Sequence, residues 1–224
     1  MIRFLDIILS AGALICLSPL LLPVILILKV TGEGEVFFYQ ERVGKSLVKF
    51  KLLKFATMLK DSPNIGTGSI TVNNDPRVLP FGKFLRKSKI NEIPQLINIL
   101  IGDMSLIGPR PVTYDAFCLY EKEVQEQISL VRPGLSGIGS IIFRDEENFL
   151  DDKLNPRLYY KEVIAPFKGE VECWYVHNQS IRLYLKAIIL TLFVLLFPNS
   201  KFIWKTFPTL PNIPDNLKEN FRDL

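Results

Sequence analysis

Residues 74–111 read NDPRVLPFGKFLRKSKINEIPQLINILIGDMSLIGPRP, a run in which apolar and basic positions alternate with turn residues. The segments FGKFLRK and EIPQLINILI predict helices within residues 80–101, with a break at SKIN. Gly102 is expected to end the second helix, because glycine readily adopts the left-handed conformation there. Basic side chains surround Glu92 and Asp103 in this stretch; they are Arg77, Lys83, Arg86, Lys87, Lys89 and Arg110.

This mixture of charges indicates a particular kind of ligand. Arginine binds phosphate oxygens in pairs, and one or two carboxylates together with substrate phosphates complete the oxygen shell of Mg²⁺. The stretch is therefore suited to a phosphate-bearing substrate that binds Mg²⁺. From composition alone, the alternative is a surface helix whose charges face water.

A second basic cluster lies upstream, soon after an apolar N-terminal segment. Its position would attract anionic lipid or phosphate, whereas a solvated basic face is equally compatible with the composition. The cluster consists of Arg42, Lys45, Lys49, Lys51, Lys54 and Lys60.

The apolar N-terminal segment covers residues 4–28, FLDIILSAGALICLSPLLLPVILIL. As a helix it would be about 37 Å long, enough to cross a hydrocarbon core of about 30 Å. Ser18-Pro19 and Pro23 interrupt it, so a kinked helix that enters and leaves on one side is the alternative. A cleaved signal peptide fits poorly, because the apolar run is too long and lacks a small-residue cleavage site.

Shorter patterns flank the central stretch. Residues 31–60 predict two short strands around a turn at Gly44, and residues 61–76 predict a long loop rich in turn residues. A helix is expected between Tyr114 and Val131. LVRPGLSGIGS then reads as a Gly/Pro loop, and DEENFLDDKLNPRLYYKEV as an acidic helical region interrupted by Pro156.

The C-terminal part predicts an apolar helix and a tail. The charge-free run Ala187–Phe197 is too short to span a membrane and suits a helix that lies in the interface or packs beside the first segment. Residues 198–224, rich in Pro, Asn and charge, predict a surface tail. We therefore expect three parts: a membrane helix at 1–30, a domain at 31–197 and the tail at 198–224.

The amino-acid composition excludes several kinds of catalytic and metal site. The chain has 224 residues, 48% of them hydrophobic, which allows one domain and a membrane segment. Its three cysteines form no C-x-x-C pattern, which argues against disulfide frameworks and thiolate metal sites. The single histidine, His177, disfavours a Ser-His or Cys-His nucleophile. Acid–base or metal chemistry must therefore use carboxylates.

Six motifs in unbroken order closely resemble the small monotopic phosphoglycosyl transferases, bacterial sugar transferases that start the assembly of lipid-linked glycans. The resemblance covers nearly the whole chain, and GDMSLIGPRP is its most specific part. The motifs are FYQERVGK (38–45), KFATM (54–58), NDPRVLPFGKFLRK (74–87), NEIPQLINILIGDMSLIGPRP (91–111), RPGLSG (132–137) and YVHNQS (175–180).

The resemblance implies an α/β fold, mostly helical with a small sheet, and a re-entrant N-terminal helix bent at Ser18-Pro19. It implies a monotopic protein with interfacial helices at the cytoplasmic face of the bacterial inner membrane. The implied cofactor is Mg²⁺, and the implied partners are a nucleotide sugar, usually a uridine one, polyprenyl phosphate or a polyprenyl-linked acceptor, and membrane lipids. A homodimer is compatible with these expectations, and nucleic acid is not an expected partner.

The resemblance also assigns roles to residues. In the family an Asp-Glu pair stands where this chain has Asn91-Glu92; the Asp attacks the donor's phosphate and the Glu helps to hold Mg²⁺. Glu92 therefore carries over, with Asp103 as a second candidate metal ligand, whereas Asn91 lacks a nucleophilic oxygen. Asn91 is alternatively a helix N-cap. The candidate substrate-binding residues are Lys54, Arg77, Arg86, Arg110 and Arg144.

Two other departures accompany Asn91. Ala56 stands where the family typically has an arginine, and IGSIIFRDEENF replaces the usual continuation after RPGLSG. Asp145 and Glu146, with Glu147, are candidates for a relocated catalytic carboxylate; the alternative is an exposed acidic helix start. Arg144 matches a family arginine only in part, since Phe143 replaces the glycine before it.

Three functions follow from these observations. The first is transfer of a sugar phosphate to polyprenyl phosphate, through another carboxylate or by direct attack of the lipid phosphate. The second is a glycosyltransferase that adds a sugar to a lipid-linked acceptor and releases a nucleoside diphosphate. The third is a non-catalytic homologue, which the retained Glu92, Asp103 and basic array disfavour.

Overall fold

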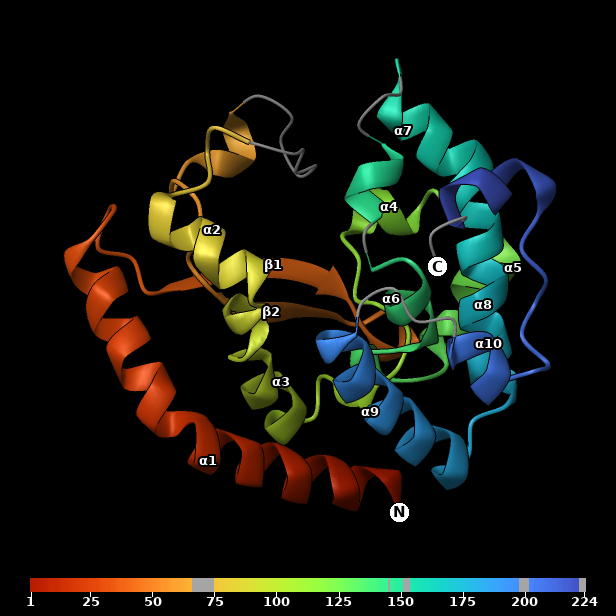
Figure 1. The fold of residues 1–224 in the computed structure, drawn as a ribbon, viewed down its shortest axis with the longest axis horizontal. Helices are drawn as coiled ribbons and strands as arrows, with labels where there is room; N and C mark the ends of the chain where they lie inside the picture. The colour runs from red at the N-terminus through yellow and green to blue at the C-terminus, as the bar shows by residue number, and fades with distance from the viewer. Residues whose placement is uncertain (66–74, 145, 151–153, 198–201, 222–224) are drawn as a thin grey trace.

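A computed structural model describes residues 1–65, 75–144, 146–150, 154–197 and 202–221. Within these residues the fold is mostly helical, with two small two-stranded sheets, as expected for the α/β class. Helix α1 (Ile2–Val30) follows one edge of the molecule, and the remaining elements lie on its concave side (Figure 1).

Helix α1 is the one described helix that is long and apolar enough to cross a membrane. It contains Pro19 and Pro23, and Figure 1 shows that it is bent. Because Pro19 has no N–H to offer to the carbonyl of Ile15, the hydroxyl of Ser18 donates to that carbonyl instead, at 2.8 Å. The carbonyl of Ile15 is thus not left unsatisfied by Pro19.

The first half of α1 is fixed to the domain by polar contacts that the sequence analysis did not predict. Asp6 is 1% exposed, and its Oδ1 accepts from Ser105 Oγ and Leu106 N, each at 2.9 Å, and from Tyr184 Oη at 2.7 Å. Arg3 donates to the carbonyl of Leu100 at 2.7 Å and also to that of Ile99. These contacts make α1 part of the folded domain.

The predicted hairpin is confirmed. Strands β1 (Phe37–Val43) and β2 (Lys49–Phe55) pair antiparallel, with Val43 opposite Lys49 at the closed end. The amide of Gly44 donates to Val48 O at 2.9 Å and closes the turn. Burial alternates in the first part of β2, and Lys54 lies on the same face as the buried Phe50 and Leu52, where its side chain pairs with Glu92.

The predicted helix–break–helix unit is also confirmed, as α2 (Pro80–Lys87), the 3-10 turn η3 (Ile90–Glu92) and α3 (Gln95–Ile101). Gly102 ends α3 with a φ of 103°. Asn98 fastens α3 to β2, because its Oδ1 accepts from Leu53 N at 2.9 Å and its Nδ2 donates to Lys51 O at 2.8 Å. This unit fixes Glu92 opposite β2.

The Gly/Pro loop after Leu130 contains a short strand that was not expected. Strands β3 (Ser105–Ile107) and β4 (Gly134–Ser136) pair parallel. Glycine permits the close approach that follows β3, since a Cβ at Gly134 would lie 2.1 Å from Gly108 N. Three-residue strands are too short to show an alternating pattern, which is why the sequence read only as a loop.

The second half of the chain is helical, and two predictions are corrected there. The single helix expected between Tyr114 and Val131 is two helices, α4 and α5, and Pro156 begins a helix, capped by Asn155, instead of interrupting one. The elements are α4 (Tyr114–Phe117), α5 (Lys122–Ser129), α6 (Ile138–Ile142), η4 (Glu146–Phe149), α7 (Pro156–Tyr159), η5 (Tyr160–Ile164, a π-helical turn), α8 (Ala165–His177) and α9 (Ile181–Leu196).

The expectation of a surface tail at 198–224 is wrong for its described residues. Helix α10 (Phe202–Thr206) and the turn η6 (Asp215–Phe221) pack on the largest core cluster. The ring of Phe221 stacks edge-on against those of Phe143, Phe149 and Phe167. Aromatic residues spaced among polar ones thus anchor a segment whose average composition is that of a tail.

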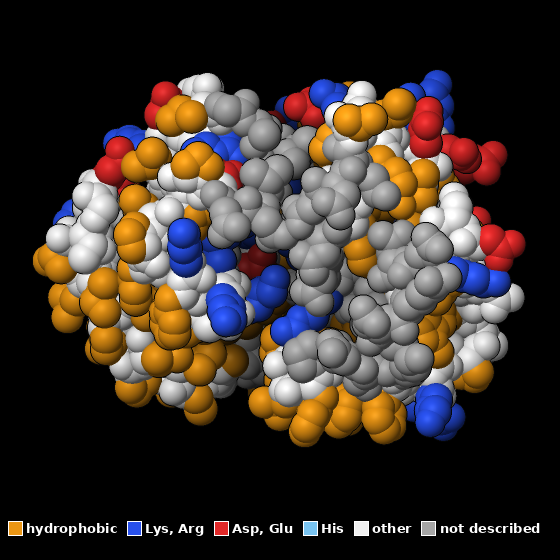
Figure 2. Space-filling model, turned by 45° about the horizontal axis from the view of Figure 1, so that its top comes forward, with side chains coloured by type: hydrophobic (Ala, Val, Ile, Leu, Met, Phe, Trp, Pro, Cys, Tyr) orange, Lys and Arg blue, Asp and Glu red, His pale blue; other side chains and the backbone are white. Residues whose placement is uncertain are grey.

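Helices α1 and α9 also expose apolar side chains. Helix α9 buries one face, including Tyr184 and Ala187, and leaves Ile189 and Leu192 mostly exposed. Most large apolar side chains of α1 are likewise exposed, and Figure 2 shows hydrophobic side chains along the left and lower edges of the molecule. Such a surface is apolar enough to meet lipid.

A cationic candidate active site around Glu92

Glu92 lies at the centre of a cluster of cations from three distant parts of the chain. Its Oε1 is 3.1 Å from Nζ of Lys54, on β2, and 3.7 Å from Nη2 of Arg110, which follows β3. The side chains of Lys54 and Glu92 are each about four-fifths buried, whereas that of Arg110 is 41% exposed. The cluster is therefore closed on the Lys54 side and open on the Arg110 side.

Arg42, on β1, adds a third cation. Burial and the charge of Arg110 lower its pKa to about 10, although Glu92 counteracts them. Its Nη2 donates to Gln40 Oε1 at 2.6 Å, while its buried Nε has no partner among the described residues. The sequence analysis placed Arg42 only in the upstream basic cluster; its place in the FYQERVGK motif was the signal that could have singled it out.

The electrostatics of this cluster favour an anionic ligand. Burial alone would raise the pKa of Glu92, but Lys54 and Arg110 lower it to about 2, so this carboxylate is ionised at neutral pH. Burial lowers the pKa of Lys54, and Arg110 and Arg42 lower it further, while Glu92 raises it. Three cations thus face one carboxylate, and an excess of positive charge remains for a ligand.

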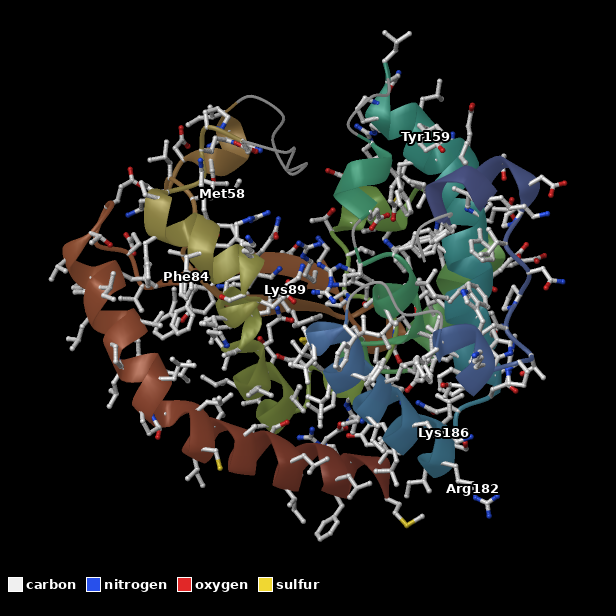
Figure 3. The ribbon with its side chains drawn as sticks, viewed as in Figure 1. Met58, Phe84, Lys89, Tyr159, Arg182 and Lys186 are labelled. Carbon is white, nitrogen blue, oxygen red and sulfur yellow. The ribbon has the colours of Figure 1, made fainter. Side chains whose placement is uncertain are left out.

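The exposed side chain of Arg110 opens the cluster to solvent. Figure 2 shows Lys and Arg side chains gathered around a hollow at the centre of the face, with acidic side chains within it. Lys89, in the left-handed conformation between α2 and η3, points toward the same region (Figure 3) and helps to lower the pKa of Glu92. A phosphate group entering this hollow meets basic side chains from several elements.

Asn91 is 7% exposed, and its Oδ1 is buried without a hydrogen-bond partner among the described atoms. The alternative of a helix N-cap is wrong, because α3 begins at Gln95 with Pro94 in the capping position and without a side-chain cap. A buried amide oxygen without a partner is costly, which indicates a local requirement other than helix capping.

Comparisons with known proteins identify the family of this chain. The family model for bacterial sugar transferases matches residues 1–198. The chain belongs to the bacterial sugar transferase family. This confirms the resemblance that the six motifs carried, over nearly the same part of the chain.

Three relatives illustrate the range of this family. The chain is 31% identical to an uncharacterized sugar transferase of Haemophilus influenzae, over 80% of this chain and 37% of the relative. It is 35% identical to UDP-glucose:undecaprenyl-phosphate glucose-1-phosphate transferase of Klebsiella pneumoniae, over 85% and 39%. It is 39% identical to the exopolysaccharide production protein PSS of Rhizobium leguminosarum, over 62% and 72%. The chain thus spans less than half of the first two relatives.

The two expected metal ligands, Glu92 and Asp103, are not brought together. Asp103 follows the C-terminal end of α3 and its Oδ2 accepts from Asn98 Nδ2 at 3.3 Å, whereas Glu92 precedes that helix. Seven helical residues of about 1.5 Å each separate the two carboxylates. Nor does the described part of the chain hold a group of three or more His, Cys, Asp or Glu placed to bind a metal. Within the described residues, the carboxylate of Glu92 lies beside the cationic cluster, and the next residue along the chain, Asn91, has a buried Oδ1 without a hydrogen-bond partner.

Arg77 is a structural residue, which corrects its assignment to substrate binding. It is 3% exposed and makes a two-pronged ion pair with Asp75, with Nη2 to Oδ2 at 2.6 Å and Nε to Oδ1 at 2.9 Å. Its Nη1 donates to the carbonyls of Ser62 and Ile65. The guanidinium therefore fastens the chain around Ser62 to the segment before α2.

The two other predicted arginines, Arg86 and Arg144, lie near the C-terminal ends of α2 and α6. Arg86 is half-buried in the last turn of α2, and Arg144 donates to the carbonyl of Val194 near the end of α9, where helix carbonyls lack partners. Their roles with substrate stay predictions. Asp145 lies outside the described residues, as does the side chain of Glu147.

Glu146 belongs to a second, buried group of charges that the sequence analysis missed in part. Its Oε2 accepts from Nζ of Lys168, on α8, at 2.6 Å. Lys168 and Glu172, one turn apart on α8, are each 2% exposed. Their spacing among Phe167, Val171 and Tyr175 was the available signal, because it places two charges on a helix that the core surrounds.

Proposed function

We propose that the transferase moves a sugar phosphate from a nucleoside diphosphate sugar to a polyprenyl phosphate carrier, in the biosynthesis of bacterial polysaccharides or glycoconjugates. The observation that carries this proposal is the excess of cations, Arg42, Lys54 and Arg110, around the ionised Glu92. A diphosphate and a phosphate monoester meeting at one site bring the negative charge that such a cluster stabilises. The name of the Klebsiella relative describes this type of reaction.

The proposed chemical step is a direct displacement. An oxygen of the lipid phosphate attacks the β-phosphorus of the donor, the bond from that phosphorus to the oxygen bridging the two phosphates breaks, and a nucleoside monophosphate leaves with the bond's electron pair. Lys54, Arg42 and Arg110 neutralise the negative charge on the oxygens of the transferred group. Direct attack is preferred over a covalent intermediate because Asn91 has no nucleophilic carboxylate.

Mg²⁺ fits this site through hard oxygen donors. The carboxylate of Glu92 and the unpartnered Oδ1 of Asn91 would hold it together with donor phosphates, since Mg²⁺ uses one or two protein oxygens and completes its shell with substrate. When bound, the ion supplies Lewis-acid stabilisation of phosphate charge. Asp103 does not take part in this proposed set.

The exposed apolar faces of α1 and α9 support a location on the inner membrane, with α1 as a re-entrant helix and the site on the cytoplasmic face. The lipid carrier then reaches the site from the bilayer, and the soluble donor reaches it from the cytoplasm. Arg182 extends away from the domain at the start of α9 (Figure 3), where it can contact anionic headgroups.

The test of the function identifies the nucleotide that is released. The protein in nanodiscs is incubated with a panel of UDP-sugars, Mg²⁺ and undecaprenyl phosphate or its glycosylated forms. We expect UMP; release of UDP would instead support a glycosyltransferase, and no release over the panel a non-catalytic homologue. Glu92→Gln should abolish the activity, whereas Lys122→Met, an exposed change on α5, should leave it unchanged.

A further inference from the structure

The segment Pro109-Arg110-Pro111 offers a single backbone donor, because proline has no N–H. That donor, Arg110 N, bonds to Oε1 of Glu172 on α8, at 3.2 Å and 62 residues away. On either side the chain is held by carbonyls: Pro109 O accepts from Gly134 N at 2.8 Å, and Val112 O accepts from Val43 N at 3.1 Å. Glu172 thus supplies a side-chain hydrogen bond that holds this backbone from a distant helix.

Burying the carboxylate of Glu172 at this position costs free energy of folding. The residue is 2% exposed, and its Oε2 has no hydrogen-bond partner in the described structure. The fold makes room for it with a glycine, since a Cβ at Gly139 would lie 2.4 Å from Glu172 Oε1. A buried carboxylate with one unsatisfied oxygen destabilises the fold, so its presence is best explained by what it holds.

Several charged and titratable groups face Glu172. They come from the segment after β3, from η4, from α8 and from the connection between α4 and α5; they are Arg110, Glu146, Lys168, Cys173, Tyr175 and Tyr120. Burial raises the pKa of Glu172 to about 7, although Arg110 and Lys168 act in the opposite direction. Lys168 forms an ion pair with Glu146; burial acts to lower the pKa of Lys168, but the charge of Glu146, with smaller contributions from other neighbouring groups, outweighs it and the pKa is raised.

We propose that Glu172 is a positioning residue for the phosphate site: it holds the backbone at Arg110 so that the guanidinium stays beside Glu92. This inference rests on the function proposed above for that site. The side chain of Arg110 is 41% exposed and long, and without a fixed backbone it loses its orientation toward the donor phosphates. Glu172 affects the reaction only by orienting Arg110 and does not itself contact the substrate.

A double-mutant cycle tests whether Glu172 acts through Arg110. We expect Glu172→Ala to lower kcat/KM for the nucleotide sugar about tenfold, mainly through a higher KM, and Arg110→Met to lower it at least as much. In the Arg110→Met background, Glu172→Ala should change kcat/KM less than about twofold. Equal effects of Glu172→Ala in both backgrounds would overturn the proposal, because a purely structural role does not depend on Arg110.

Glu172→Gln provides a variant that preserves the acceptor oxygen and removes the charge. An ionised carboxylate accepts the Arg110 N–H more strongly than a neutral group does. The ratio of wild-type to variant kcat/KM should therefore rise several-fold from about pH 6 to about pH 8, and using the ratio cancels the titration of the acceptor phosphate. A flat ratio, with the variant as active as wild type, would show that the ionised carboxylate is not needed.

Binding of UDP with Mg²⁺, followed by calorimetry, separates failure of this inference from failure of the proposed function. If wild type transfers no sugar phosphate, the proposed reaction is wrong, but weaker UDP binding by Glu172→Gln and Arg110→Met would still support positioning. If wild type is active and both variants bind UDP as it does, the positioning role is wrong on its own. Thermal unfolding of each variant identifies loss of folding.

Discussion

Lys54 and Glu92 form a buried ion pair whose two members depend on each other. Burial of a carboxylate favours its neutral form, and the pKa of Glu92 lies near 2 only because Lys54 and Arg110 face it. Lys54 in turn has a lowered pKa, which its neighbour partly offsets. This mutual dependence at the residue scale makes the pair a sensitive probe of the site.

We expect Lys54→Met to lower kcat/KM by about 10²-fold, since it removes a fixed cation from the phosphate site. The same change removes the largest influence that keeps Glu92 ionised, so the pKa of Glu92 rises. Activity should then decline as pH falls through this raised pKa, whereas wild type has no such decline from Glu92 above about pH 2 to 3. A pH–rate profile from pH 5 upward that is parallel for the two proteins would contradict this prediction.

Asn91 determines whether the reaction passes through a covalent enzyme. With an amide at this position, we expect UMP to be released only when undecaprenyl phosphate is present. Asn91→Asp should instead release up to one equivalent of UMP without acceptor, and the phosphosugar should appear on the protein by mass spectrometry. An acceptor-independent burst from the wild type would mean that another carboxylate is the nucleophile.

At the scale of elements, α1 is joined to the domain through a charged residue within an apolar helix. Asp6 accepts three hydrogen bonds, two from the segment that forms β3 and one from α9. Because β3 leads directly to Arg110, the long apolar helix and the candidate site share one support. A change at Asp6 should therefore affect both.

Asp6→Ala would leave the hydroxyls of Ser105 and Tyr184 and the amide of Leu106 without their acceptor. Each buried group left unpaired costs about 1–3 kcal/mol, so we expect a loss of at least about 3 kcal/mol in the free energy of unfolding. Thermal unfolding in nanodiscs measures it. Asp6→Asn, which retains an acceptor oxygen, should lose less, and the exposed Asp115→Asn should match wild type; equal losses for both Asp6 variants would contradict the hydrogen-bond account.

At the scale of the whole molecule, the C-terminal segment completes the core instead of trailing from it. Its buried residues close over the rings of Phe143, Phe149 and Phe167. They are Ile203, Phe207, Leu210, Leu217 and Phe221. Since burying one such side chain contributes about 1.5–3 kcal/mol, the set is comparable with the whole stability of a domain, about 5–15 kcal/mol.

Ending the chain after residue 201 should therefore abolish cooperative unfolding, as followed by intrinsic fluorescence against temperature. Phe221→Ala should show a graded loss of about 3–5 kcal/mol, and Lys218→Ala, at an exposed position, should be neutral. A truncated protein that unfolds at the temperature of the full chain would mean that the segment contributes little to the core.

Local sequence was enough to predict the hairpin around Gly44, the two helices on either side of SKIN, the end of α3 at Gly102 and the membership in the sugar transferase family. These features depend on short-range periodicity, turn chemistry and the spacing of motifs, all of which can be read along one chain. Lys54, Glu92 and Arg110 were chosen on the same basis, and the structure places them together.

Only the tertiary structure decided which charges serve the fold and which face the site. From the sequence, Arg77 and Arg110 were both candidate substrate-binding residues of the same basic stretch. In the structure, Arg77 pairs with Asp75 in the interior, whereas Arg110 lies beside Glu92. The contacts of Glu172 with Arg110, and of Asp6 with Tyr184, join residues far apart in the chain. The role of a buried polar side chain depends on the hydrogen-bond or ion-pair partner that it contacts. That partner is set by how elements distant in the sequence pack together, which no local sequence pattern encodes.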